Sequence, residues 1–451
     1  MKKSLLTLLA AGISLGAFAQ VASPSPDWTT LQNTNFPTTS AGLILMDVLD
    51  VNTVWGLGNY GTNGRQSNLF TMTSNGGSTW TTGAILPDTN TYQISNIEGV
   101  DANTCWMSAW IKSSGNKGVV YNTTNGGTTW TNVTPVGSFT NAASFADFIC
   151  FVTPSVGVLV GDPVGGDFEI WKTTNAGTSW SKIAGANIPN PLSGSEYGLT
   201  DSYFSLGNTI WFGTNLGRVY KSTDAGSTWT VSAAMSGITE VSRIAFTDAN
   251  NGLCAGTSGS ASNLMQTTDG GATWLNMGVP LNCGFNDIAP ITGTSWFASV
   301  SNPSLTMAYT MDNGANWTDW GSMNIGYLQI GFANNNVGWA GTFSDASSVG
   351  VGGVYKYNGI PLGIAQSSGA PIAINMFPNP SNGVVHIQLP SAKKGLEISV
   401  KDALGKVVYS EKVTTTTMED KTLNLQSLAK GIYFVDVTTE KTKYHQKIVI
   451  E

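Results

Sequence analysis

The sequence is poor in histidine and in charge. Only two of its 451 residues are histidines, His386 and His445, and both lie near the C-terminus. Charged residues make up 11% of the chain, against an ordinary share of about a quarter. Residues 20–370 contain no histidine, which excludes His-based acid–base catalysis, a Ser–His triad and His-ligated zinc from this larger part of the chain.

Positive charge is especially scarce in that larger part. Residues 20–370 hold 9 Lys and Arg against 20 Asp and Glu, whereas residues 371–451 hold 10 against 8. Nucleic-acid binding depends on basic stripes that contact phosphates, and residues 20–370 have none. We therefore expect no nucleic-acid partner.

Long apolar runs are almost absent as well. The run from Leu5 to Leu15 follows Met1-Lys2-Lys3 and precedes Ala17-Phe18-Ala19, which is the layout of a secretory signal peptide over residues 1–19. Because no other run reaches about 18 apolar residues, we expect no transmembrane helix.

Cysteine is limited to four residues without CxxC spacing: Cys105, Cys150, Cys254 and Cys283. This number fits an exported protein with up to two disulfides, whose pairing the sequence does not fix. The spacing favours no metal site, and nothing in the sequence indicates a cofactor.

Glycine is in excess, with 53 residues, and much of it belongs to a repeat. An octapeptide such as Thr123-Thr-Asn-Gly-Gly-Thr-Thr-Trp130 occurs six times, with its tryptophans 43–50 residues apart. We interpret each copy as a hairpin turn. The third residue, Asn or Asp, bonds to backbone amides two residues on, the fifth residue, Gly, supplies a positive φ, and Trp starts the next strand. The third and last positions are Asn75 and Trp80, Asn125 and Trp130, Asn175 and Trp180, Asp224 and Trp229, Asp269 and Trp274, and Asp312 and Trp317.

A second repeated element, exemplified by Asn52-Thr-Val-Trp55, precedes each octapeptide and occurs seven times. The spacing is that of a four-stranded propeller blade, so the sequence predicts a seven-bladed β-propeller over residues 20–359. The last blade has a third strand at 353–356 but no octapeptide. We expect Asp27-Trp28-Thr29-Thr30 to supply its fourth strand and close the ring. Residues at one repeated strand position are predicted to form core between blades: Trp55, Trp106, Trp211, Trp296 and Trp339.

The octapeptides resemble the Asp-box, or BNR repeat, of sialidases, sortilin-type propellers and photosystem II assembly factors. This resemblance implies that the boxes are structural hairpins on the side of the propeller away from the ligand site. Sialidases also use three arginines. The three in this region, Arg65, Arg218 and Arg243, do not stand in that family's Arg-Ile-Pro motif, so we do not expect sialidase activity. The export signals likewise argue against a photosystem assembly factor.

Acidic residues on the innermost strands are the remaining candidates for catalysis. Alignment of the first strands puts Asp47 and Glu98 at equivalent sites in adjacent blades, and Asp147 two residues earlier on the same strand face. Paired carboxylates of this kind hydrolyse glycosidic bonds. The pattern favours solvated or cation-binding channel residues, and no spacing rule separates that interpretation from catalysis.

The loops after the second and fourth strands form the predicted binding surface. They are rich in Gly, Ser and Asn, with scattered aromatic residues that could stack on sugar rings or peptide side chains. The candidate ligand contacts are the aromatic residues Tyr60, Trp110 and Tyr197 and the acceptors Asp162, Asp167 and Glu196.

The C-terminal region differs in composition, with frequent lysine and no tryptophan. Strand-like alternations at 384–389, 396–400, 407–409, 422–425, 432–437 and 444–450 predict a small Ig-like β-sandwich over residues 374–451, after a linker over 360–373. Its landmarks resemble the type A sorting domain of the type IX secretion system, also called the Por secretion tail. They are Pro378, Asn379, Pro380, Asp402, Gly405, Lys406, Gly431 and Tyr433.

This resemblance implies that the secretion machinery is a partner and that the chain crosses the inner and outer membranes, to be released or attached to the cell surface. The sequence therefore predicts an exported all-β protein with a non-catalytic, glycan- or protein-binding propeller. The alternative is a glycoside hydrolase that uses the channel carboxylates.

Overall fold

The computed structural model divides the chain into two compact units, Met1–Ile360 and Pro361–Glu451. The structure describes residues 28–451 apart from 29, 61–64, 86–90, 113–116, 142, 193, 259–260, 279–284, 301–306, 321–325, 358–374, 389–395, 403–405, 414–419 and 439–442. The predicted signal peptide and linker, with Cys283 and Gly405, therefore lie outside the described residues. Within the described part, the only helical element is a 3-10 turn, η1 (Gly185–Asn187), and the rest of the regular structure is β.

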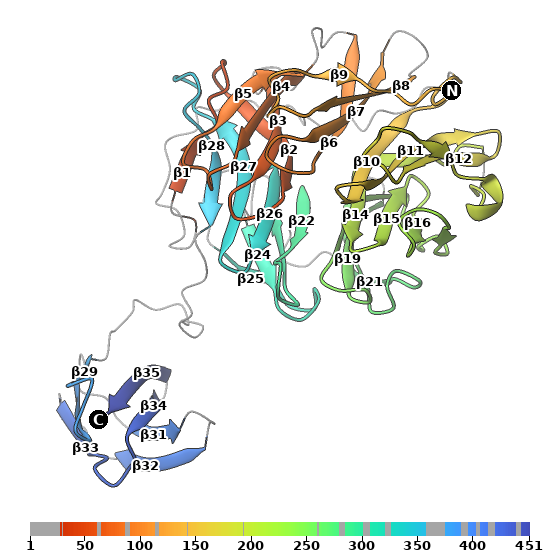
Figure 1. Cartoon of the computed structure of the whole chain (residues 1–451). Helices are drawn as coiled ribbons and strands as arrows, with labels where there is room; N and C mark the ends of the chain where they lie inside the picture. The colour runs from red at the N-terminus through yellow and green to blue at the C-terminus, as the bar shows by residue number, and fades with distance from the viewer. Residues whose placement is uncertain are drawn as a thin grey trace. The chain divides into compact units, whose positions relative to one another are not determined.

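The first unit contains one eight-stranded sheet, in which β2 pairs with β27, and five four-stranded antiparallel sheets (Figure 1). We divide these strands into groups of four, which we call blades. Observed strands overlap all the predicted second strands, the sixth of them only at Phe297. In blades 1 to 6 the strands follow chain order from the innermost to the outermost. Blade 1 comprises β2 (Ala41–Val48), β3 (Val54–Tyr60), β4 (Arg65–Thr73) and β5 (Thr81–Ala84); blade 2, β6 (Tyr92–Gly99), β7 (Cys105–Ile111), β8 (Gly118–Thr123) and β9 (Thr131–Asn132); blade 3, β10 (Ala146–Thr153), β11 (Val156–Val164), β12 (Asp167–Thr173) and β13 (Ser181–Lys182).

The remaining blades repeat this plan and complete the ring. Blade 4 comprises β14 (Gly198–Leu206), β15 (Thr209–Thr214), β16 (Val219–Ser222) and β17 (Thr230–Val231); blade 5, β18 (Glu240–Phe246), β19 (Gly252–Ser258), β20 (Ala261–Thr267) and β21 (Leu275–Gly278); blade 6, β22 (Asp287–Pro290), β23 (Phe297–Val300), β24 (Met307–Thr310) and β25 (Thr318–Asp319); blade 7, β26 (Gln329–Asn334), β27 (Val337–Ser344), β28 (Gly352–Tyr357) and β1 (Thr30–Asn33). Each innermost strand contacts that of the next blade, and β26 contacts β2. The innermost strands therefore surround a central axis, and we call the region that they enclose the channel.

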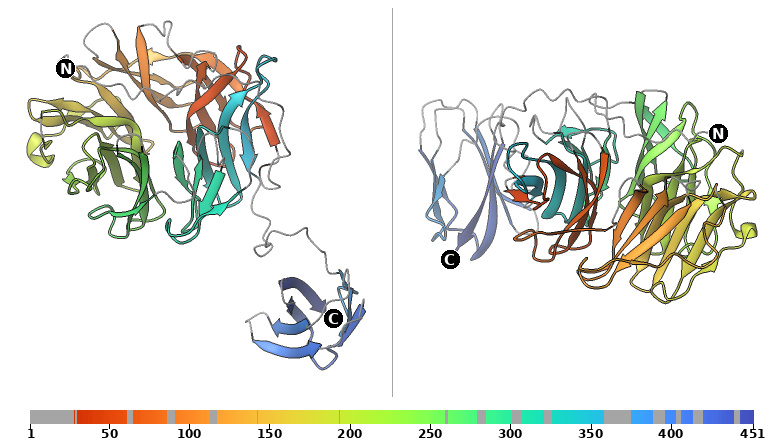
Figure 2. Two further views of the ribbon diagram at one scale, coloured as in Figure 1. Left: turned by 180° about the vertical axis from the view of Figure 1, so that it is seen from behind. Right: turned by 90° about the horizontal axis from the view of Figure 1, so that it is seen from above.

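The N-terminal strand closes the ring, as the sequence predicts. β1 pairs antiparallel with β28, with Thr30 opposite Lys356 and Asn33 opposite Gly353. The red strand lies beside the cyan strands in Figure 1 and, from behind, in Figure 2. Trp28 is fully buried and packs edge-on against Trp320 of blade 6 at 5.7 Å between ring centroids. The first and last strands of the propeller thus share one sheet.

The six boxes form one repeated hairpin at one end of the ring. In the first box, the Thr73 hydroxyl accepts a hydrogen bond from the Gly77 amide at 2.9 Å, and Asn75 Oδ1 accepts one from the Thr79 amide at 2.9 Å. The bonded amide is therefore four residues beyond the Asn, not two, because the side chain spans the whole turn. The Gly76 amide donates to the Asn52 carbonyl at 3.0 Å, which places each box beside the turn between the first and second strands.

We call this end of the ring, with the boxes and the first-to-second-strand turns, the box end. The connections after each second and fourth strand lie at the opposite end, which we call the open end. Each innermost strand starts at the open end and finishes at the box end.

The fifth residue of each box is glycine for two physical reasons. Its φ is positive, 81° at Gly127 and 74° at Gly177, a conformation that only glycine adopts without strain. A Cβ there would also collide with the preceding blade: it would lie 2.1 Å from the Phe70 ring at Gly127 and 2.2 Å from the Trp106 ring at Gly177. The boxes therefore pack blade against blade.

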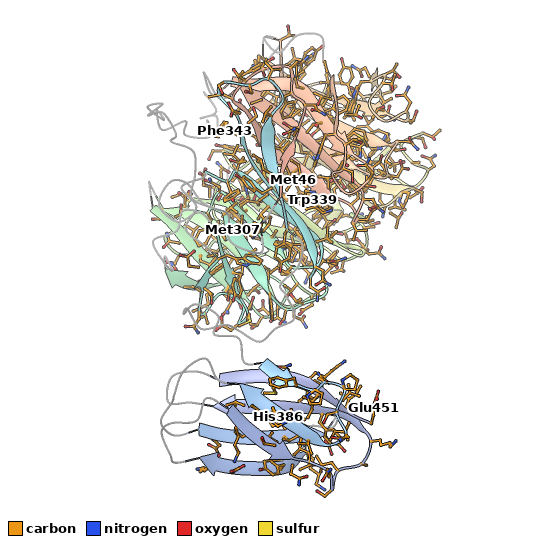
Figure 3. All side chains as sticks on the ribbon, turned by 90° about the vertical axis from the view of Figure 1, so that its left-hand side faces the viewer. Met46, Met307, Trp339, Phe343, His386 and Glu451 are labelled. Carbon is orange, nitrogen blue, oxygen red and sulfur yellow. The ribbon has the colours of Figure 1, made fainter. Side chains whose placement is uncertain are left out.

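The repeated second-strand tryptophans form much of the core between blades. Trp55, Trp211 and Trp339 are fully buried, and Trp106 is buried too. Trp339 packs with residues of blades 7 and 1, among them Met46 (Figure 3). Trp296 departs from the prediction, because it is only partly buried beside Tyr309.

Long polar side chains link some third strands to the next box. Lys356 Nζ donates to the Gly76 carbonyl at 2.7 Å, which joins blade 7 to blade 1, and Lys172 Nζ donates to the Asp224 carbonyl at 3.0 Å. These bonds join each of the two boxes to the third strand of the preceding blade.

The second unit is a two-sheet sandwich in which all six predicted strands are present. Its buried core includes Val385, Val400 and Val435, and His386 lies on one of its strands (Figure 3). One sheet has the order β29 (Asn375–Phe377), β30 (Val384–Gln388), β33 (Asp420–Asn424), and the other β32 (Val407–Val413), β31 (Leu396–Asp402), β34 (Gly431–Thr438), β35 (Lys443–Ile450).

Several landmark residues of the second unit form hydrogen bonds within it. Asn379, between Pro378 and Pro380, donates to the Lys447 carbonyl at 2.8 Å and accepts from the Val449 amide at 2.9 Å. These bonds fasten the start of the unit to its last strand, β35. Elsewhere in the unit, Asp402 accepts from the Lys406 amide at 3.0 Å, and the Tyr433 hydroxyl donates to the Ala429 carbonyl near Gly431, at 2.8 Å.

Candidate functional site

Acidic residues occur on the innermost strands of blades 1 to 6, one on each strand. The seven innermost strands carry six carboxylates and one basic residue, Arg243. The carboxylates are Asp47, Glu98, Asp147, Asp201, Glu240 and Asp287. They fall into separate groups along the channel.

Asp47 and Glu98 act as struts between blades at the box end. Both are the second-last residue of their strand. Asp47 Oδ2 accepts from the Gly99 amide of blade 2 at 2.7 Å, and Glu98 Oε1 accepts from the Phe151 amide of blade 3 at 2.7 Å. The predicted equivalence of the two carboxylates is thus visible in their bonds, because each receives an amide from the next blade.

The second oxygen of Glu98 reaches across the channel. Glu98 Oε2 accepts from the Tyr203 hydroxyl of blade 4 at 2.8 Å, and Asn96 Nδ2 donates to the same hydroxyl at 3.0 Å. Tyr203 also stacks on Phe148 with ring centroids 4.5 Å apart. We call Asp47, Asn96, Glu98 and Tyr203 the Glu98 network.

Burial controls the electrostatics of this network. It raises the pKa of Asp47 to about 6, opposed by the Gly99 amide. Burial, and then the charge of Asp47, hold the pKa of Glu98 well above its usual range. A retaining glycosidase combines a carboxyl group of raised pKa with one of ordinary pKa. Here, however, both Glu98 oxygens accept hydrogen bonds from protein donors.

Asp147 does not join Asp47 and Glu98. It is the second residue of β10, at the open end, whereas they lie at the box end. A β-bulge between Ala146 and Phe148 displaces it from the regular register, and its carboxyl lies near Gly198 of blade 4. The predicted convergence of the three carboxylates is therefore wrong for Asp147.

The described cysteines, Cys105, Cys150 and Cys254, are buried free thiols, so none of the up to two disulfides that the sequence allows is formed among them. Burial raises the pKa of Cys105 and of Cys150 well above the usual range, and the charges of Asp47 and Glu98 add to this. Both thiols are therefore protonated core groups beside the Glu98 network.

A second polar group, which the sequence did not identify, occupies the channel nearer the open end. Arg243 Nη2 lies 3.0 Å from Asp201 Oδ2, and its Nε lies 3.7 Å from Asp287 Oδ1. Gln329 Nε2 donates to Asp201 Oδ2 at 3.2 Å. These four residues, the Arg243 network, come from blades 4 to 7. Residues 201 and 203 of β14 thus anchor the two networks.

Within the Arg243 network, burial raises the pKa of Asp287 to about 7 and that of Asp201 above its usual value, in both cases against the opposing charge of Arg243. The Asp287 oxygens accept the Ile288 and Ile330 amides at 2.9 and 2.8 Å. Asp201 has φ +59°, rare for a residue with a side chain. Acidic positions on the first strands were the signal that could have found this group.

Three predicted ligand contacts prove to be buried. Trp110 is 7% exposed and packs on Phe145, and Asp162 is 2% exposed. Glu196 forms a buried ion pair with Arg218 at 2.9 Å and accepts from the Thr214 hydroxyl at 2.8 Å. These three residues support the open-end loops from within, so we no longer assign them to ligand contact.

The other three predicted contacts, Tyr60, Asp167 and Tyr197, are partly exposed at the open end. Tyr60 ends β3 and Asp167 starts β12. Tyr197 directly precedes β14, and burial, then the charge of Glu240, raise its pKa. They remain predictions as ligand contacts.

Two hollows on the described surface lie along the outer strands of blades 4 and 5. One is lined by Gln266, Thr267, Thr268, Thr273, Trp274 and Leu275, and the other includes Lys221, Thr228 and Ala272. Neither lining contains a carboxylate. Among the described residues, no group of three or more His, Cys, Asp or Glu side chains could hold a metal ion.

The second unit identifies the class of the chain. Residues 375–451 match the family model of the secretion system C-terminal sorting domain, the Por secretion tail. The chain is therefore a β-propeller protein that the type IX secretion system exports to the extracellular space or the cell surface. In the described part, no helix is long and apolar enough to cross a membrane.

Similarity to solved structures concerns the propeller. YCF48 from Cyanidioschyzon merolae is 16% identical with a TM-score of 0.51, over 73% of this chain and 99% of that chain. The GH74 enzyme of Niastella koreensis is 16% identical with a TM-score of 0.26, over 89% of this chain and 69% of that chain. No curated protein matches the sequence. At these identities the similarity to YCF48 supports the fold alone.

Proposed function

We propose that this protein is a non-catalytic binding module, which the type IX system exports and which holds a glycan or a protein at the open end of its propeller. The observation that carries this proposal is the state of Glu98. Both its oxygens accept hydrogen bonds from protein groups, the Phe151 amide and the Tyr203 hydroxyl. Each oxygen of Glu98 thus already has a protein donor from another blade, which supports a role in holding the ring together rather than in catalysis.

The contrast between the two ends of the ring supports the location. At the box end, Asn and Asp oxygens are used within their own hairpins, as Asn75 is. At the open end, Tyr60, Asp167 and Tyr197 keep part of their surface exposed. Exposed aromatic and acidic groups on loops held by a rigid scaffold are the usual means of recognition.

Export fits this role. We infer that residues 1–19 act as a signal peptide at the inner membrane and that the C-terminal unit is then read at the outer membrane. The Asp-box interpretation of the octapeptides, with its placement of boxes away from the ligand, belongs to the same proposal.

The proposal is tested by binding and turnover measured together. The full chain without residues 1–19 is screened on a glycan array and against extracted surface proteins, and the same glycans are assayed for release of reducing ends. We expect binding without turnover. Hydrolysis that disappears in Glu98→Gln, in a variant that keeps the parent's circular dichroism spectrum, would instead establish the glycoside hydrolase. Asp319→Asn, on the outermost strand of blade 6, is the matched control.

A further inference from the structure

The Arg243 network holds more negative charge than it neutralises. Asp201 and Asp287 share the single guanidinium of Arg243. Its Nη1 donates to the Ser242 carbonyl at 2.7 Å and its Nη2 pairs with Asp201 at 3.0 Å. Its Nε makes no hydrogen bond and lies 3.7 Å from Asp287. Asp287 therefore has only a long ionic contact, beside its backbone amides, to offset its buried charge.

The excess extends over the open-end half of the innermost strands. Asp147, Asp201, Glu240 and Asp287 stand there against Arg243 alone, whereas burial raises the pKa of Asp47 and of Glu98 at the box end and favours their protonated forms. Glu240, the first residue of β18, is partly exposed at the open end and acts electrostatically on Tyr197. A recess lined by one sign of charge concentrates ions of the other sign, so the open end of the channel attracts cationic groups.

The network is recessed but not closed. The side chain of Asp201 keeps 27% of its surface exposed, that of Arg243 keeps 14%, and that of Asp287 keeps 12%. A group that reaches these atoms must be slender. A lysine side chain carries its ammonium on a flexible four-carbon stem, whereas the amine of an amino sugar is attached directly to a bulky ring.

We propose that the Arg243 network, at the open end of the channel, receives the ammonium group of a lysine side chain from a protein ligand. The ammonium donates to Asp201 and supplies the positive charge that Asp201 and Asp287 lack. This inference rests on the proposed binding function and specifies its ligand as a protein. No covalent step is involved, and the lysine is bound in its ordinary protonated form.

The primary test compares two peptides on the unaltered full chain without residues 1–19. Acetyl-Gly-Gly-Lys-Gly-Gly-amide and the same peptide with Nε-acetyl-lysine are titrated by calorimetry at pH 7 and low salt. We expect the charged peptide to bind at least about tenfold tighter, and its affinity to fall as salt is added. Equal affinity for the two peptides overturns the inference.

Two variants locate the binding on the network. Asp201→Asn should lower the affinity for the charged peptide about tenfold. Asp319→Asn makes the same change in net charge on an exposed outer strand and should leave that affinity unchanged. An equal loss in both variants, or none in Asp201→Asn, overturns the assignment. If Asp201→Asn alters the circular dichroism spectrum, a chemical-shift map of the parent with both peptides decides, since shifts at Gln329 and Asp201 support the site and shifts confined elsewhere contradict it.

A further arm separates this inference from the function on which it rests. A glucosamine tetramer is compared with its fully N-acetylated counterpart. Amine-dependent binding of the tetramer together with no binding of the lysine peptide would contradict the lysine assignment and leave the binding module standing. Binding of neutral glycans alone would have the same consequence. If the protein bound nothing on the glycan array and none of the peptides, the proposed function itself would be contradicted.

Discussion

The two ends of the propeller use polar groups in opposite ways. At the box end, the oxygens of Glu98 accept hydrogen bonds from other blades, and those of the boxes accept hydrogen bonds within their own hairpins. At the open end, the Arg243 network leaves carboxylates that share one cation and stay partly exposed. Acidic residues on equivalent strands thus hold the ring together at one end and remain available to a ligand at the other.

This difference shows that the position of a carboxylate along its strand decides which partners it has. Near the box end, the next blade offers backbone amides such as that of Gly99. Near the open end, Asp201 pairs with side chains from other blades, and Asp287 combines such a contact with the Ile330 amide of blade 7. Substitutions at the box end should therefore affect the free energy of unfolding, and those at the open end should affect binding.

The largest effect is expected for a box tryptophan. Trp229 is 6% exposed, packs edge-on against Phe212 at 5.3 Å and donates to the Gly226 carbonyl at 3.1 Å. Trp229→Ala should lower the free energy of unfolding by about 3–5 kcal/mol through the cavity it leaves. Urea denaturation measures this, and Trp130→Ala, at a partly exposed box position, should cost less. Equal costs would contradict the dependence on burial.

A smaller loss is expected in the Glu98 network. Glu98→Ala leaves the Phe151 amide and the Tyr203 hydroxyl without their acceptor, which should cost about 2–4 kcal/mol. Ligand affinity of the folded fraction should stay the same. Asp319→Ala on an exposed strand serves as the control. A variant that keeps its stability but loses binding would reverse our assignment of the two ends.

Stability should also depend on pH, because two buried carboxyls take up protons more readily in the folded state. Burial raises the pKa of Asp47 to about 6 and of Asp287 to about 7. The folded protein then binds more protons than the unfolded chain from about pH 4 to about pH 7. Their contribution to stability is complete below about pH 4 and is lost as the pH rises through 6 and 7.

Denaturation midpoints of the parent and of Asp287→Asn at pH 5 and pH 8 test this. The variant, which does not titrate at this position, should lose less stability between the two pH values, by at least about 1 kcal/mol. Identical pH dependence in the two proteins would show that Asp287 ionises normally in the folded state.

The smallest effect concerns the junction of blades 7 and 1. Lys356 donates to the Gly76 carbonyl at 2.7 Å and lies 5.5 Å from the centre of the Trp339 ring. Lys356→Met removes both interactions and should cost about 1 kcal/mol. Lys182→Met, at an exposed position on β13, should cost nothing measurable. A loss of the same size in both variants would assign the effect to net charge.

The repeat made the propeller predictable from the sequence. Each box places a glycine where φ must be positive and a neighbouring blade leaves no room for a side chain, as at Gly127. These local requirements occur once in each blade that has a box, so the spacing between boxes gives the length of a blade. The unpaired third strand at 353–356 then calls for a partner, which β1 provides.

The candidate site was predictable only in part, because its contacts cross blades without a repeat. Asp47 and Glu98 were found, since each bonds to the next blade in the same way. Tyr203 lies 105 residues from Glu98, and Gln329 lies 128 residues from Asp201. Such pairs depend on which side chains meet in the channel, and no spacing rule encodes that.

Local irregularity and burial account for the other differences. The β-bulge at Asp147 turns a regular alternation into a displaced side chain. Glu196 was predicted as a ligand contact because it lies in a polar loop, but it forms a buried ion pair with Arg218 near β16. A single sequence does not reveal such a distant partner.

Closure by β1 has a mechanical consequence. β28 pairs with β27 on one side and with β1 on the other, and it is the last strand before the second unit. A force applied through that unit therefore reaches β28 first and acts along two hydrogen-bonded ladders at once. The first described strand of the chain, β1, thus helps to hold in place the strand from which the chain continues toward the sorting domain.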